Sequence, residues 1–233
     1  MKRKKIVLVG GGPGIHVNYL CEGMNFLKQD FELVEFQLLS DTSVEKWTPS
    51  LEDFIAQTKA YAVIGHSFGG MLLMNSSKVE EMVEKILLLS TFPLERAADV
   101  NASLPEINKT AFAEFLRNKT NETFKAAFLN SWAEVFFTPE SLERGKNWLA
   151  KFDYDFQLYE MSLVWYKIAK TRMNIENLQK VFNVCGELDR RTPPWGFGHL
   201  KTNASVIPGA AHFPWVESEE STANLLSKIL LHG

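Results

Sequence analysis

The chain has few cysteines, no long apolar run and no excess of positive charge. Its 233 residues include two cysteines, Cys21 and Cys185, too few for a disulfide framework or a cysteine-based metal site. No stretch reaches the roughly 18 consecutive apolar residues that a membrane-spanning helix needs. The apolar run after the basic start ends at Gly10, which is too early for a secretory signal. We therefore expect a cytoplasmic protein without a membrane span.

The balance of charge limits the kind of partner. The chain carries 25 lysines and arginines against 28 aspartates and glutamates, a net charge of −3. A chain without a basic field is a poor binder of polyanions, so we expect no nucleic-acid partner. The partner class that this leaves is a small molecule that is not strongly anionic. The sequence gives no indication of an oligomeric state.

Short apolar runs alternate with helical periodicity in the first 91 residues and again after residue 170. The runs that favour strands are 6–9, 31–39, 61–64, 85–89, 180–185 and 204–207. Helices are expected to begin at a Ser50 cap, to span 69–78 and to follow Pro193-Pro194. A last amphipathic helix carries Leu225, Leu226, Ile229 and Leu230. The alternation predicts an α/β fold with a mostly parallel, doubly wound sheet.

Residues 92–170 follow a different pattern. Strand-like runs are missing there, helical spacing of apolar residues dominates, and about half of the chain's aromatic residues fall within the segment. Thr138-Pro139-Glu140 predicts a helix start, with a capping hydroxyl, a proline at the first position and an acid in the first turn. We therefore predict one core formed by residues 1–91 and 171–233, with a helical insertion at 92–170.

Residues 65–69 have the pattern G-x-S-x-G, with Ser67 at its centre. The pattern lies between an expected buried strand and an expected helix, where a strained turn can hold a serine hydroxyl above the edge of a sheet. Small residues beside the serine let the helix pack close to the strand. The pattern alone is also compatible with an ordinary tight turn. The strand and helix around it favour a nucleophilic serine.

A serine hydroxyl needs a base that takes its proton, and the base needs an acid that fixes its tautomer. His212 is the candidate base because it follows the last expected strand, and sites of such sheets form at the carboxyl ends of strands. Asp189 is the candidate acid because it follows the strand at 180–185. Glu187 is the nearest alternative, and Asp189 could instead cap a helix. The other histidines fit structural or solvated positions better: His16, His66, His199 and His232.

Attack on a carbonyl carbon creates an oxyanion, which preset backbone N–H groups stabilise. The N–H of Phe68, directly after the serine, is one candidate donor. The glycine-rich loop 10–14 after the first strand is the expected source of the second. The same loop could instead hold a phosphate, but it completes neither G-x-G-x-x-G nor G-x-x-x-x-G-K-[ST]. We therefore expect no nucleotide, no other cofactor and no metal.

The order Ser67, Asp189, His212 resembles that of the α/β-hydrolase superfamily. The resemblance covers the chain from residue 6 to its end apart from the insertion. It implies an α/β-hydrolase fold, a catalytic triad of these three residues and a helical lid at 92–170. Within the superfamily, the loop 10–14 and the segment 212–217 resemble the prolyl aminopeptidase group. That alignment implies Gly12 as the second oxyanion donor beside Phe68.

The chain also departs from the prolyl aminopeptidase group. Residues 65–69 read G-H-S-F-G, where the group usually has G-G-S-W-G; the form found here is widespread among esterases, thioesterases and lactonases. Residues 37–41 lack the D-x-R-G-x-G pattern expected after the second strand, and the hairpin that usually precedes the first strand is missing. These departures argue against specificity for the amino end of a peptide and place an aminopeptidase second.

These observations predict a serine hydrolase that cleaves a small, largely apolar ester or amide through an acyl-enzyme intermediate, first of all an esterase or lactonase. A prolyl-aminopeptidase-like enzyme acting on short peptides and an acyl thioesterase are the alternatives among enzymes. A slow-turnover ligand receptor on the same fold is the alternative of another class. Seven aromatic residues of the insertion either line an acyl pocket or pack as core: Phe112, Phe115, Phe124, Phe128, Trp132, Phe136 and Phe137.

Overall fold

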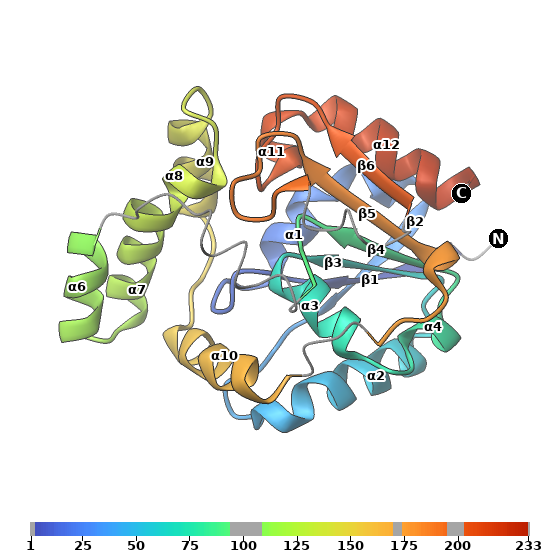
Figure 1. The fold of residues 1–233 in the computed structure, drawn as a ribbon, viewed down its shortest axis with the longest axis horizontal. Helices are drawn as coiled ribbons and strands as arrows, with labels where there is room; N and C mark the ends of the chain where they lie inside the picture. The colour runs from blue at the N-terminus through green and yellow to red at the C-terminus, as the bar shows by residue number, and fades with distance from the viewer. Residues whose placement is uncertain (1–2, 94–108, 170–173, 195–202, 233) are drawn as a thin grey trace.

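The computed structural model describes residues 3–93, 109–169, 174–194 and 203–232. Its centre is a six-stranded sheet in the order β2-β1-β3-β4-β5-β6, and every neighbouring pair is parallel (Figure 1). The strands are β1 (Lys4–Val9), β2 (Phe31–Phe36), β3 (Ala62–His66), β4 (Lys85–Leu89), β5 (Val181–Gly186) and β6 (Asn203–Ile207). The α/β fold with a mostly parallel sheet is confirmed.

Helices cover both faces of the sheet, so its central strands are buried on both sides. Alternate residues of β1 enter different cores: Ile6 and Leu8 pack on one face, Val7 and Val9 on the other. The first face is covered by α1 (Asn18–Gly23) and α12 (Glu219–His232), and the second by α2 (Trp47–Thr58) and α3 (Phe68–Asn75) (Figure 1). The shorter helices of the core are α4 (Val79–Met82) and α11 (Pro214–Glu217). Because both faces of the central strands are buried, their residues are apolar without interruption and do not alternate with polar ones.

The order of the strands reverses beside β1. From β1 the chain moves to β2 on one side, whereas β3 to β6 follow one another on the other side. Open α/β sheets bind ligands at such a switch point, outside the carboxyl ends of the strands. The loop 10–14 after β1 and Ser67 after β3 both lie at this point.

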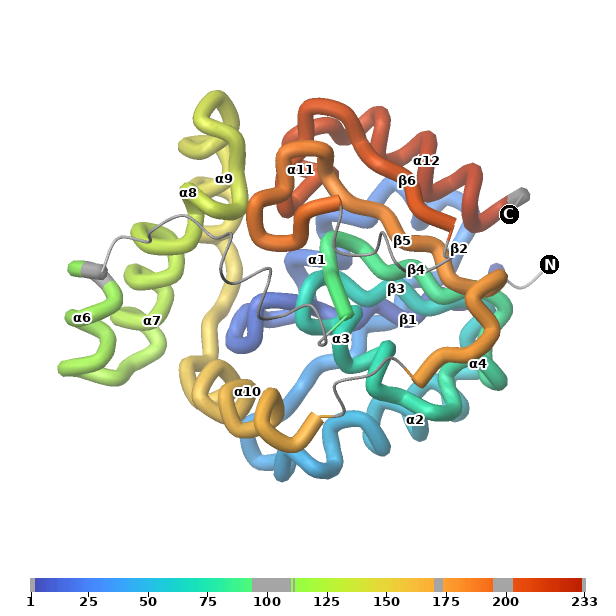
Figure 2. The backbone as a smooth tube through the Cα atoms, viewed as in Figure 1, coloured from blue at the N-terminus to red at the C-terminus, as the bar shows by residue number. Residues whose placement is uncertain are grey.

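The described part of the insertion is helical. Its helices are α6 (Lys109–Arg117), α7 (Asn121–Ala127), α8 (Ala133–Phe136), α9 (Leu142–Leu149) and α10 (Phe156–Ile168). A π-helical turn, Phe128–Trp132, joins α7 to α8. Helices α6 to α9 stand beyond the carboxyl ends of the strands, α10 lies beside α2, and both chain ends lie at the opposite edge (Figure 2). We call α6 to α10 the lid; its limits at 92 and 170 stay a prediction.

Two helix starts differ from the prediction. α2 begins at Trp47, directly after a 3₁₀ turn, so Ser50 lies inside the helix and does not cap it. The fully buried Trp47 side chain packs in the core and sets the start. α9 begins at Leu142, because Thr138 is held in a turn by the Glu217 carboxylate. Both helices form near the predicted positions, but neither Ser50 nor Thr138 caps its helix.

The strand predicted at 31–39 ends earlier, at Phe36. The next residue, Gln37, uses its side chain to bind the loop after β1 instead of extending the sheet. The helix predicted after Pro193-Pro194 lies mostly outside the described residues. The remaining strands agree with their predicted positions to within two residues at either end.

Candidate active site

Ser67 occupies the sharp turn between β3 and α3. Its backbone has φ 51° and ψ −116°, a conformation that costs a residue with a side chain about 1–3 kcal/mol. A Cβ on Gly65 would lie 2.5 Å from the Leu73 side chain, and one on Gly69 would lie 2.2 Å from the carbonyl oxygen of Val9. Glycine at both positions therefore lets α3 pack against the strand ends. The half-buried Ser67 side chain faces a cavity at this edge.

The cavity beside Ser67 has a volume of about 160 Å³ and is largely apolar. Four of the seven candidate aromatic residues line it: Phe124, Phe128, Trp132 and Phe136. The other three, Phe112, Phe115 and Phe137, pack in the surrounding core. At ~30 Å³ per water molecule the volume corresponds to about five waters, so it fits a small acyl group.

Asp189 and His212 meet after β5 and β6. The Nδ1 atom of His212 lies 3.0 and 3.2 Å from the two carboxylate oxygens of Asp189, and both side chains are almost fully buried. The same carboxylate accepts from the N–H groups of Arg191 and Thr192 and from the Thr192 hydroxyl. The alternative acid, Glu187, accepts from the N–H of Gly209 instead.

The environment of Asp189 keeps its carboxylate ionised. Burial raises the pKa of this carboxyl group, but the nearby His212 and the hydrogen bonds from His212 and Thr192 lower the pKa overall. An ionised carboxylate facing Nδ1 holds the proton of a neutral imidazole on that nitrogen. The other ring nitrogen, Nε2, is then left to accept a proton.

The structure does not join Ser67 directly to His212: within the described residues, no hydrogen bond links the hydroxyl to the imidazole. Contacts beside the two residues link their surroundings. The ring of His66, next to Ser67, lies 4.9 Å from the His212 ring. Phe136, which lines the serine cavity, stacks on the His212 imidazole at 4.8 Å. Catalytic hydrogen bonds are often long before substrate binds, so the lack of a bond between the Ser67 hydroxyl and the His212 imidazole is compatible with a triad.

Gly12 and Phe68 line the same cavity as Ser67. Gly12 has φ 52°, which glycine adopts without strain. Its carbonyl accepts from the N–H of Ile15, which closes a turn. The preceding N–H, that of Gly11, donates to the hydroxyl of Tyr19 at 2.5 Å. The N–H of Gly12, in contrast, has no hydrogen-bond acceptor among the described residues. The candidate oxyanion donor thus belongs to a residue of the cavity wall and is not used by another bond there.

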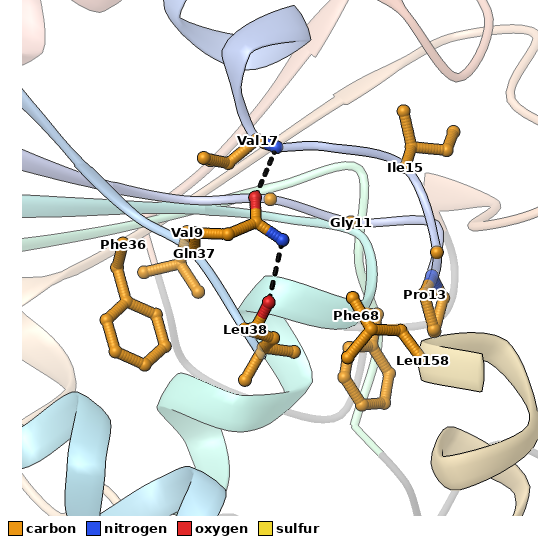
Figure 3. Close-up of a pocket in the computed structure, with 12 residues that line it drawn as sticks. Val9, Gly11, Pro13, Ile15, Val17, Phe36, Gln37, Leu38, Phe68 and Leu158 are labelled. Carbon is orange, nitrogen blue, oxygen red and sulfur yellow. Dashed lines mark hydrogen bonds between the residues drawn. The ribbon is translucent and has the colours of Figure 1, made fainter. Parts of the chain in front are cut away.

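Gln37 binds the backbone shortly after the glycine loop (Figure 3). The Gln37 Oε1 atom accepts from the N–H of Val17 at 2.8 Å, and its Nε2 atom donates to the carbonyl of Leu38 at 2.8 Å. A cavity of about 20 Å³ lies between this glutamine, Pro13 and Phe68. It holds no more than about one water molecule, so it is too small to be a substrate site.

Three residues with prominent contacts at this edge were not predicted. Tyr19 and His66 form buried hydrogen bonds with the loops that carry Gly12 and His212. Glu217 accepts from the N–H of Thr138 and from a serine hydroxyl of the lid with one oxygen, and from the N–H of Ala211 with the other. His66 and Glu217 lie within segments that the sequence analysis used, but nothing local predicts these contacts, because their partners lie far away in the sequence. His66 was expected in a structural or solvated position, and its ring bonds to Tyr19 and to the carbonyl of His212 fit a structural one.

Of the other three histidines, only His16 has a described side-chain contact. The Nδ1 atom of His16 accepts from the N–H of Asn18, His232 ends α12, and His199 lies outside the described residues. In the described ranges, no three His, Cys, Asp or Glu side chains are grouped as a metal site would need. No helix in those ranges has the length and apolar character needed to cross a bilayer.

A family model described as the alpha/beta hydrolase family matches residues 6–225. The chain belongs to the alpha/beta hydrolase family. A search of curated proteins finds no match. Membership of this family supports a hydrolase, and the six-stranded parallel sheet with its serine turn agrees with it.

Solved structures with this fold cover nearly the whole chain at low identity. An alpha/beta fold family hydrolase from Bacillus anthracis str. Sterne is 17% identical, with a TM-score of 0.73, over 98% of this chain and 93% of that one. An enol-lactonase from Burkholderia xenovorans LB400 is 15% identical, with a TM-score of 0.70, over 99% and 92%. A proline iminopeptidase-related protein from Thermus thermophilus is 18% identical, with a TM-score of 0.67, over 98% and 89%. At these identities the likeness concerns the fold.

Proposed function

We propose that this alpha/beta hydrolase is a serine hydrolase that cleaves a small, largely apolar ester or amide through an acyl-enzyme intermediate. The observation that carries the proposal is the position of Ser67: a strained turn directs it into an aromatic cavity, beside an Asp189–His212 pair. Strain at a turn of this kind persists where it serves function. An ordinary strand-to-helix turn has no need of it.

Each residue has a role in the proposed reaction. Nε2 of His212 takes the proton from the Ser67 hydroxyl as the oxygen attacks the substrate carbonyl carbon, and then gives that proton to the leaving group. Asp189 holds the imidazole and stabilises its positive form. The N–H groups of Gly12 and Phe68 stabilise the oxyanion, each contributing about 10² to 10³ in rate. A water molecule then attacks the acyl carbon while His212 takes its proton, and His212 gives that proton to the Ser67 oxygen as the acid product leaves.

The cavity favours an ester or lactone over a peptide with a free amino end. Its described lining contains Arg191 and no carboxylate. The described lining therefore offers no carboxylate that could pair with an ammonium group. Its small volume favours a short acyl group, which places a long-chain acyl thioester last among the enzyme readings. The proposed order is esterase or lactonase, then aminopeptidase, then thioesterase.

Replacement of the serine tests the proposal. In Ser67→Ala, turnover of p-nitrophenyl acetate should fall by several decades, up to about 10⁶, because the nucleophile is lost. A fluorophosphonate probe should label the wild-type chain at Ser67 and leave the alanine variant unlabelled. Ser76→Ala is the matched control, because Ser76 is buried, binds Glu52 and lies outside the cavity.

Two outcomes would contradict parts of the proposal. Full activity in Ser67→Ala would remove the serine mechanism. Labelling of Ser67 without turnover of nitrophenyl esters, lactones, acyl thioesters or aminoacyl nitroanilides would favour the slow-turnover receptor. A preference for aminoacyl nitroanilides within that panel would place the aminopeptidase first.

A further inference from the structure

A buried chain of hydrogen bonds links the loops that carry Gly12, Ser67 and His212. The Gly11 N–H lies 2.5 Å from the Tyr19 hydroxyl oxygen, which lies 2.6 Å from Nδ1 of His66. Nε2 of His66 lies 3.1 Å from the carbonyl oxygen of His212. Tyr19 and His66 are 0% and 1% exposed, so water does not compete for these bonds. The chain thus spans all three loops of the proposed active site.

The direction of every bond follows from the two ends. A backbone N–H only donates and a carbonyl oxygen only accepts. The Tyr19 oxygen therefore accepts from Gly11, and Nε2 of His66 must carry a proton to reach His212. Burial and the nearby His212 lower the pKa of His66, so its ring is neutral. Nδ1 is then unprotonated and accepts the hydroxyl proton of Tyr19. One arrangement of protons satisfies all four groups.

Aromatic side chains enclose this hydrogen-bonded chain and keep it rigid. Tyr19 stacks on Trp215 at 6.3 Å, and Trp215 meets the edge of the His66 ring at 4.9 Å. The backbone of Gly11 packs closely against the serine turn. A Cβ added at Gly11 would lie 2.5 Å from both the His66 carbonyl oxygen and the Ser67 Cβ. A shift of either loop is therefore transmitted to the serine turn.

We propose that Tyr19 and His66 are positioning residues, which hold the oxyanion loop and the loop of the general base in register with the nucleophile. The inference rests on the proposed function of the same site. The bond to Tyr19 fixes the backbone at Gly11. It thereby holds the next N–H, that of Gly12, in place for the oxyanion. The bond to His66 holds the backbone of His212, while Asp189 holds its ring. Neither Tyr19 nor His66 lines the cavity beside Ser67.

Paired variants test the kinetic consequence. Tyr19→Phe keeps the ring and removes the hydroxyl, and we expect kcat for p-nitrophenyl acetate to fall about 10- to 100-fold with KM nearly unchanged, since a displacement near 1 Å costs rates of this order. His66→Phe should behave alike. His66→Gln should recover most of the rate, because its amide keeps a donor for His212 and an acceptor for Tyr19. Tyr61→Phe is the control: its hydroxyl donates to Leu230, and Tyr61 precedes the amino end of β3, whereas Ser67 follows its carboxyl end.

A spectroscopic measurement tests the network independently of turnover. With ¹⁵N-labelled histidine, the signal that disappears in His66→Phe should report a neutral ring protonated at Nε2 in the wild-type chain. In Tyr19→Phe that ring should show a share of the Nδ1-protonated form, since the donor to Nδ1 is gone. A wild-type ring protonated at Nδ1 would overturn the inference. So would a Tyr19→Phe variant whose kcat equals that of Tyr61→Phe.

The two proposals fail in different ways. If the fluorophosphonate does not label the wild-type chain, the proposed function is wrong, and the positioning role falls with it even when the tautomer is as expected. If labelling of Ser67 is normal and the Tyr19 and His66 variants keep wild-type kcat, the inference alone is wrong.

Discussion

At the scale of single residues, the site depends on charges and conformations that are costly by themselves. The backbone of Ser67 is strained, and the Asp189 carboxylate is buried without contact with water. Hydrogen bonds from Thr192, Arg191 and His212 offset the desolvation of that carboxylate. Each costly feature therefore has neighbours that maintain it, and removal of one partner has a predictable result.

Asp189→Asn should lower kcat by about 10⁴, the size of the corresponding effect in a serine protease, because the amide favours the wrong tautomer of His212.

The lowered pKa of the Asp189 carboxylate also links this residue to stability. Its contribution is fully present above the ordinary carboxyl pKa of 3.8 and is lost as the pH falls through the lower pKa of the folded state. The difference in free energy of unfolding between wild type and Asp189→Asn should therefore be constant from pH 7 to 5 and shrink below that. Urea unfolding at each pH measures it; a difference that widens on acidification would contradict the assignment.

At the scale of elements, close packing of α3 against the sheet outweighs helix propensity. Gly69 lies in the first turn of α3, where propensity alone favours alanine by about 1 kcal/mol. A Cβ there would lie 2.2 Å from the carbonyl oxygen of Val9 and 2.7 Å from that of Gly10. Both are backbone atoms, so relief requires movement of the end of β1 and of the loop that follows it.

Gly69→Ala should therefore destabilise the chain by about 1–3 kcal/mol, in spite of the better helix propensity. Because the displaced segment leads to Gly12, activity should fall as well. Thermal unfolding and p-nitrophenyl acetate turnover measure the two effects. Gly209→Ala is the comparison: no atom lies within 4 Å of its Cβ position, and its φ of 68° predicts a cost of about 1–2 kcal/mol from strain alone. Unchanged activity in Gly69→Ala would show that the loop does not follow α3.

At the scale of the whole molecule, the lid and the core meet at the loop that carries His212. The N–H of His212 donates to the carbonyl of Phe136, whose ring stacks on the imidazole. Glu217 binds the N–H of Thr138 in the lid at 2.9 Å and that of Ala211 in the core at 2.6 Å. The lid is therefore held to the core beside the proposed general base, and loosening this contact should affect both.

Glu217→Gln should weaken this attachment, because the amide turns one acceptor into a donor that faces an N–H group. Hydrogen bonds to charged groups contribute about 1.5–3 kcal/mol each, so amide hydrogen exchange in α8 and α9 should become faster and kcat should fall. Hydrogen-exchange mass spectrometry measures the first effect. Glu187→Gln is the matched control, since that carboxylate also accepts a backbone N–H, from Gly209, but has no hydrogen bond to a lid residue in the described part of the chain. Equal exchange in the two variants would contradict this role for Glu217.

The sequence by itself determined the alternation of strands and helices, the serine turn and the order of the three proposed triad residues. These features could be predicted because each depends on neighbours within a few positions: apolar periodicity for the strands, and glycines beside Ser67 for the turn. The aromatic character of the insertion was also evident, but not which of its rings reach the cavity.

Only the tertiary structure decided the contacts between distant segments. Tyr19 and His66 are 47 positions apart, His66 and His212 are 146 apart, and Thr138 and Glu217 are 79 apart. No local pattern encodes such pairs, because the sheet order brings their loops to one edge. The same reason explains why α2 begins at the buried Trp47 and not at Ser50: burial in a shared core outweighs a local capping preference.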